Sequence, residues 1–105
     1  MKYMLLICVD PDRTEKTDDV EPWVKEMDER GVRVLGNELR PPSDATTVRV
    51  RDGEVLTADG PFAETKEWIA GFDIIECENL DEAIAVAAAH PMAASNMVDI
   101  RPFRS

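Results

Sequence analysis

Histidine is nearly absent from this chain, since His90 is the only one among 105 residues. Cysteine is scarce too, and Cys8 and Cys77 lie so far apart that the ligand spacing of a zinc site is missing. Basic residues are outnumbered, with 12 Lys and Arg against 22 Asp and Glu, which leaves a net charge of −10. Because no basic stripe exists, we expect no binding to nucleic acid or to an anionic membrane surface.

Long apolar runs are also missing. The apolar run near the start, residues 3–9, is far too short to cross a bilayer. Asp10, Asp12 and Arg13 follow it directly, with no small-residue cleavage site of a secretory signal. We therefore expect a cytoplasmic protein whose cysteines are free thiols packed in the core. A phosphate loop, a dinucleotide fingerprint and a nucleophile elbow are absent, so any enzyme activity is expected to need no cofactor and no metal.

The hydrophobic pattern predicts one domain spanning residues 1–105, because a chain of this length forms a single core. Apolar runs predict strands, stripes at helical spacing predict two helices, and Asp52-Gly53 predicts a hairpin turn. This order favours an α+β ferredoxin-like sandwich, an antiparallel sheet with two helices on one face. The expected strands are 2–9, 32–39, 46–51, 54–57, 68–77 and 97–101, and the helices start at a cap on Thr17 or Asp18 and at Asn79.

Each predicted helix has one apolar stripe to bury. We expect the first helix to stop at Gly31 and the second at Pro91, while Gly36 indicates a bulge or a close approach within its strand. The expected buried stripes are Val20, Trp23, Val24 and Met27 in the first helix and Leu80, Ala83, Ile84 and Ala87 in the second.

The first strand is apolar on both faces. Two helices in a domain of this size cover only one face of the sheet, so the other face is left open. We therefore expect a second subunit to cover it.

A rigid turn, Asp59-Gly60-Pro61, opens a polar segment that presents Glu64, Lys66 and Glu67. These charges form either the wall of a ligand pocket or an ordinary solvated connection, and both interpretations stay open. Asp73 interrupts an otherwise apolar strand face and is a further candidate for contact with a ligand.

Residues 46–53 and 59–67 together resemble the DGPF-domain branch of the YciI-like (YCII-related) family, and residues 2–7, 80–83 and 98–102 match it as well. The resemblance implies a dimeric α/β-barrel, in which two ferredoxin-like units pack sheet to sheet as a homodimer. It also implies a link to sigma factors, because many bacterial relatives are encoded beside extracytoplasmic-function sigma factors. The wider superfamily includes cofactor-free monooxygenases, isomerases and lyases. At the positions of residues 69–73, family members usually show a glycine followed by aromatic residues. This chain departs from that pattern, because Asp73 stands there.

The resemblance further implies a catalytic His and Asp pair, with His90 at the histidine before a proline and Asp10 at the acid after the first strand. In that role His90 is the general base and Asp10 orients its ring. The alternative is a histidine that forms only local hydrogen bonds at a helix end. Two functions therefore stay open. One is a cofactor-free lyase or isomerase of a small organic molecule, and the other is a non-catalytic homodimer that senses a ligand or contacts a sigma factor.

Overall fold

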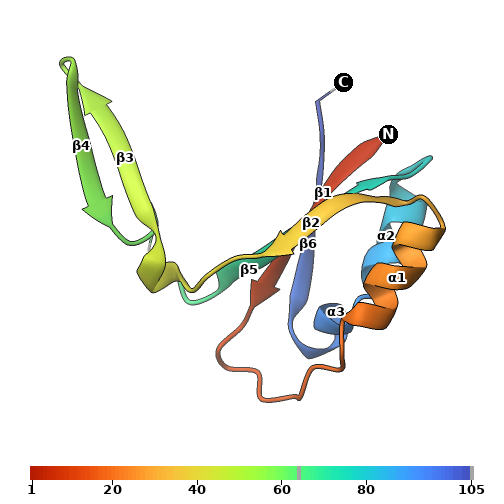
Figure 1. Ribbon diagram of the computed structural model, residues 1–105. Helices are drawn as coiled ribbons and strands as arrows, with labels where there is room; N and C mark the ends of the chain where they lie inside the picture. Colours follow the sequence, from red (N-terminus) through yellow and green to blue (C-terminus); the bar gives the residue numbers. More distant parts are fainter. Residues whose placement is uncertain (64, 105) are drawn as a thin grey trace.

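The computed structural model describes residues 1–63 and 65–104, and its centre is an antiparallel sheet with the strand order β2-β5-β1-β6 (Figure 1). Both helices of the prediction, with a short third helix after them, pack on this body, which confirms the α+β, ferredoxin-like class. The sheet strands are β1 (Lys2–Val9), β2 (Arg33–Glu38), β5 (Trp68–Glu76) and β6 (Met97–Pro102), and the helices are α1 (Glu21–Glu29), α2 (Leu80–Ala88) and α3 (Pro91–Ser95).

The core lies between the sheet and the helices. Tyr3, Leu5 and Ile7 of β1 are buried on this side, because alternate residues of a strand point to the same face. Met4 and Leu6 point to the other face and are only half-buried. Each fully buried side chain of this size stabilises the fold by about 1.5–3 kcal/mol. Both faces of β1 are apolar, but only the face toward the helices is buried, and the other face is left open.

Helix α1 begins later than predicted. Its N-cap is Val20, which makes no side-chain cap, so the expectation of a cap on Thr17 or Asp18 is wrong. The Thr17 hydroxyl lies 2.6 Å from the Ser95 hydroxyl instead. Pro22 fits the first turn because the amide hydrogen that proline lacks has no partner there. The predicted stripe is confirmed by its buried members Trp23 and Met27 and its partly buried member Val24, and Gly31 follows the helix end at a φ of 70°.

Helix α2 begins as predicted, with Asn79 Oδ1 accepting from the amide of Glu82 at 2.9 Å. Its buried face differs from the prediction. Leu80 and Ile84 are each 49% exposed, whereas Val86 joins Ala83 and Ala87 in the core. The helix is therefore rotated about its axis relative to the prediction, and the face that it buries carries Ala83, Val86 and Ala87. The three-residue spacing between Ala83 and Val86 is as typical of one helical face as the spacing of the predicted stripe is.

The predicted hairpin is confirmed, but it stands apart from the main sheet. Strands β3 (Thr46–Arg51) and β4 (Glu54–Asp59) form a separate two-stranded sheet that projects from the body (Figure 1). Asp52 and Gly53 close it with φ values of 51° and 77°, as a two-residue hairpin turn requires. A short 3₁₀ turn, Pro42–Asp44, lies at its base. We call residues 46–59 the arm.

Candidate functional site

A cluster of charged and polar side chains lies between the sheet and the helices, with Asp73 and His90 buried and Asp28 exposed at its edge. At its centre is Asp73 of β5, which is 6% exposed. Arg33 of β2 donates from Nε to Asp73 Oδ1 at 2.8 Å and reaches Asp28 Oδ1 at 3.4 Å. His90 lies near enough for its charge to act on Asp73. We call Asp28, Arg33, Asp73 and His90 the Asp73 cluster.

Gly36 makes room for this cluster. It lies opposite Asp73 in the β2–β5 register. A Cβ at Gly36 would lie 2.0 Å from Asp73 Oδ1 and 2.6 Å from the carbonyl oxygen of Phe72. The carboxylate therefore occupies the space that any other side chain at this position would need. The close approach predicted at Gly36 is confirmed, and Asp73 is its cause.

His90 lies between α2 and α3 and is 3% exposed. Its backbone is extended before Pro91, as predicted, and its Nδ1 accepts the amide hydrogen of Met92 at 3.0 Å. His90 is thus the N-cap of α3, a helix that the sequence did not lead us to expect. Its ring also meets Trp23 edge to face, with ring centroids 4.6 Å apart.

The cap determines what the imidazole of His90 can do. Because Nδ1 accepts a hydrogen bond, the proton of the neutral ring is assigned to Nε2. Burial lowers the pKa of His90, and the charge of Asp73 opposes this shift only in part. A neutral ring in this state donates through Nε2 and has no free lone pair with which to take a proton. To act as a base, His90 would have to release the amide of Met92.

The environment shifts the pKa of Asp73 in the opposite direction. Burial raises the pKa of Asp73, while its hydrogen bond from Arg33 and the charges of Arg33 and His90 counteract that effect. Burial disfavours a charge, so both Asp73 and His90 are pushed towards their neutral forms. Two adjacent groups shifted in this way are typical of sites that handle protons, although structural ion pairs produce the same pattern.

Asp10 was expected to orient His90, but its contacts lie elsewhere. Its Oδ1 accepts from the amide of Asp12 at 3.0 Å, and its own amide donates to Asn96 Oδ1 at 3.0 Å. Across residues 1–63 and 65–104 we find no hydrogen bond that joins Asp10 to His90. The acidic neighbour of His90 is Asp73, so a catalytic role for Asp10 stays a prediction that this geometry does not support.

The polar segment after the turn at Gly60 meets the loop after β1. Lys66 forms an ion pair with Asp12, and this hydrogen bond raises the pKa of Lys66. Glu67 is half-buried. The pKa of the Cys8 thiol is raised mainly by the burial of Cys8, next by the charge of Asp99 and then by the charge of Glu67. The predicted ligand residues therefore fall into two groups, Lys66 and Glu67 beside the first loop and Asp73 beside His90. Glu64 lies outside the described residues.

An open groove of about 1010 Å³ lies where the arm joins the body. It is mainly apolar, and the most exposed large hydrophobic residue on it is Phe62, at 83%. The cation Arg40 on its wall is paired with Asp44 at 3.1 Å. The segments that line it are residues 39–45, 60–63 and 65–69. The segment expected to form a pocket wall thus does line a groove, but the groove is built mostly from apolar side chains.

Two features of these sites were missed from the sequence. Arg33 was not singled out, although it is the cation of a strand that pairs with the strand of Asp73. In the register Arg33 lies opposite Ile75, two residues from Asp73, so only the sheet order could have pointed to it. Pro41, Pro42 and Ala45, which line the groove, were not singled out either. Within the part of the chain that is described, His, Cys, Asp and Glu do not gather in threes close enough to hold a metal ion.

Comparison with known proteins gives the family. A family model described as the YCII-related domain matches residues 1–104. The chain belongs to the YCII-related family. A relative from Rhizobium meliloti (strain 1021), named Uncharacterized protein R00369, is 38% identical over 99 residues, covering 76% of this chain and 78% of that protein. Membership of the DGPF branch stays a prediction that rests on residues 46–53 and 59–67. No helix of the described residues is long and apolar enough to cross a membrane.

Proposed function

We propose that this YCII-related protein is a homodimer that binds a small organic molecule and that the Asp73 cluster supports its fold rather than a reaction. The observation that carries this proposal is the hydrogen bond from the Met92 amide to His90 Nδ1. It occupies the nitrogen with which a neutral histidine would act as a base. Arg33 and Asp73 likewise satisfy each other. The cluster has the character of a closed structural network.

The groove at the base of the arm is the ligand site of this proposal. Ligand sites are concave and mostly apolar, with a few polar groups that fix orientation. Both cations on the groove wall, Arg40 and Lys66, are already paired with carboxylates. The chain also carries a net charge of −10, which repels anions. A neutral or cationic molecule with an apolar or aromatic body fits these surroundings.

The homodimer of this proposal is supported by the open face of the sheet. The register places Leu6 beside Phe72 and Met4 beside Ile74 on the face away from the helices. Leu35 extends this apolar face on β2 and is 49% exposed. An apolar surface of this kind marks a site of association. A second subunit packed sheet to sheet would bury it.

The ligand site is tested with Nile red, a neutral aromatic dye whose fluorescence rises in apolar surroundings. We expect the Phe62→Ala variant to bind the dye about tenfold more weakly, because one aromatic wall is lost. Ile84→Ala is the matched control, since Ile84 is a large exposed side chain on α2, away from the groove. If both variants bind the dye like the original protein, the groove is not the site.

A cofactor-free lyase or isomerase is the second candidate. The observation that favours it is the raised pKa of Asp73 beside the lowered pKa of His90. Such an enzyme would exchange carbon-bound hydrogen of its substrate with solvent, so NMR of a metabolite mixture in D₂O detects it. The original protein would then remove a C–H signal by exchange with deuterium. If this exchange stops in Asp73→Asn or His90→Gln variants that stay folded, this candidate is established. If the exchange stops only in the Asp10→Asn variant, the catalytic pair of His90 and Asp10 that was first predicted is restored.

A regulatory role would follow if the dimer contacts a sigma factor in the cytoplasm, as the family resemblance implies. This association stays a prediction. Co-purification of a sigma factor with the tagged protein, abolished by a variant of the groove, would support it. A tagged protein that recovers no sigma factor from cells expressing one would count against it.

A further inference from the structure

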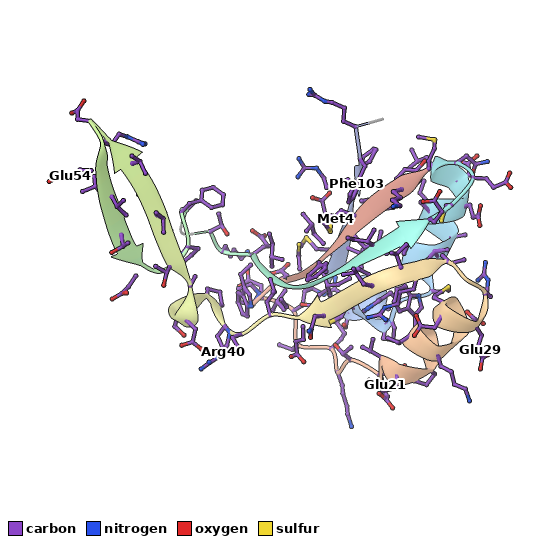
Figure 2. The ribbon with its side chains drawn as sticks, turned by 45° about the horizontal axis from the view of Figure 1, so that its top comes forward. Met4, Glu21, Glu29, Arg40, Glu54 and Phe103 are labelled. Carbon is purple, nitrogen blue, oxygen red and sulfur yellow. The ribbon has the colours of Figure 1, made fainter. Side chains whose placement is uncertain are left out.

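The arm projects from the body and exposes an apolar face. Figure 2 shows it from its base near Arg40 to its tip at Glu54. Val50 lies opposite Val55 in the β3–β4 register, so their side chains share one face, and Val48 lies on the same face. These valines are 57%, 67% and 60% exposed, respectively. Strands β3 and β4 hydrogen-bond only to each other within the sheets described.

An arm of this kind is not stable when nothing covers it. A two-stranded ribbon alone in water is marginally stable at best, and it needs a third strand or a packing surface. Valine favours strands because it packs well on a half-buried pleated surface. The valines of the arm have no such surface within their own chain.

The size of the molecule gives a measure of what is uncovered. The chain exposes 7446 Å², whereas a compact monomer of 11.7 kDa exposes about 5,900 Å². Its radius of gyration is 15.7 Å, against about 13 Å for a compact domain of this length. The excess surface of about 1,500 Å² exceeds the roughly 800 Å² that each partner buries in a stable interface. The molecule therefore has enough uncovered surface for a dimer in which the arm takes part.

We propose that the arm of each subunit packs on a second copy of this chain through the face with Val48, Val50 and Val55. This inference rests on the proposed homodimer and extends it, because packing the two main sheets together would not by itself involve the arm. Two-fold symmetry makes the contact reciprocal, so each dimer contains two arms with the same role.

Apolar area, rather than charge, favours a second copy as the partner. The other face of the arm carries Arg49 and Arg51, and Glu54 lies opposite Arg51 on that face. Asp52, Glu54 and Asp59 outnumber the two arginines of the arm, so the arm has no cationic excess. The open apolar face of the main sheet, with Leu35 49% exposed, shows that a second copy offers apolar surface of the kind that the valines need.

The test replaces the central valine pair. We expect the double variant Val50→Gln, Val55→Gln to weaken the dimer roughly 100-fold or more in sedimentation equilibrium, since four valines per dimer lose their cover. The matched control is Arg51→Gln, Glu54→Gln, a cross-strand pair one rung away on the other face. We expect the control to change the dissociation constant less than about tenfold, because exposed charge pairs contribute little.

The outcomes separate the arm from the dimer. An original protein that stays monomeric at 0.1 mM, roughly a hundred times a micromolar dissociation constant, overturns both the homodimer and the arm contact. A dimer that the valine variant leaves intact overturns the arm contact alone. If the variant misfolds, hydrogen exchange of the original protein decides: amides of β3 and β4 should be protected in the dimer and lose protection on dilution. Rapid exchange of these amides in a stable dimer contradicts the proposal.

Discussion

The substitution Gly36→Ala tests the packing of the Asp73 cluster. The new methyl group would lie 2.0 Å from Asp73 Oδ1 and 2.6 Å from a backbone oxygen of Phe72, so the carboxylate must leave Arg33. Breaking a buried ion pair costs about 3–5 kcal/mol. The low end applies, because the Arg33 side chain is 17% exposed. Alanine in place of glycine within a strand returns about 0.5–1 kcal/mol. We expect a net loss of about 2–2.5 kcal/mol in the free energy of unfolding.

The assay is urea denaturation of Gly36→Ala, alone and combined with Asp73→Ala. The combined variant should lose clearly less than the sum of the single variants, because its carboxylate is gone and only the contact with the carbonyl of Phe72 remains. Gly71→Ala is the matched control, since its Cβ would approach nothing closer than 3.0 Å. A Gly36→Ala protein within about 0.5 kcal/mol of the original, or losses that add fully, would refute this account of the cluster.

Three other predictions concern single side chains. Trp23→Phe removes the donor that meets the Val86 carbonyl at 3.0 Å and should cost about 1–3 kcal/mol, measured by urea denaturation. Asn79→Ala removes the cap of α2 and should cost about 1 kcal/mol, seen as a lower Tm. The lowered pKa of His90 means that the unfolded chain binds a proton near pH 6.5 while the folded one does not, so stability should fall as the pH drops below 6.5. His90→Gln should flatten this part of the pH profile, and an unchanged slope would contradict the assignment.

The elements of the fold could be predicted where local pattern and backbone chemistry agree. The first strand is a continuous apolar run that ends before Asp10, and Asp52-Gly53 can adopt the positive φ of a hairpin turn, so both were predicted correctly. The cap at Asn79 needs only a residue type and a spacing of three. Such signals involve neighbours in the chain, and tertiary contacts seldom override them.

The face of α2 and the start of α1 could not be predicted in the same way. Either side of α2 carries apolar residues, and only packing on the sheet decides that Val86 is buried and Ile84 exposed. Thr17 had the right chemistry for a cap, but its hydroxyl is held by Ser95, which is 78 positions away in the sequence. Contacts between such distant residues leave no periodic signal in the chain.

The candidate site was predicted in part for the same reason. His90, Asp73 and the segment after Gly60 were singled out because each departs from its local pattern, and the structure buries His90 and Asp73 side by side. Their partners depend on which strands pair. Arg33 reaches Asp73 only because β2 lies beside β5, and this neighbour relation comes from the sheet order.

The state of the His90 ring tests the central claim most directly, because a single histidine gives a single pair of ring-nitrogen signals in ¹⁵N NMR. We expect a neutral ring at pH 7 with its proton on Nε2 and a pKa below the usual 6.5, as the hydrogen bond from Met92 and the burial of the ring require. A ring protonated on Nδ1, or a cationic ring at pH 7, would contradict the claim that His90 is a structural cap and would favour its role as a general base.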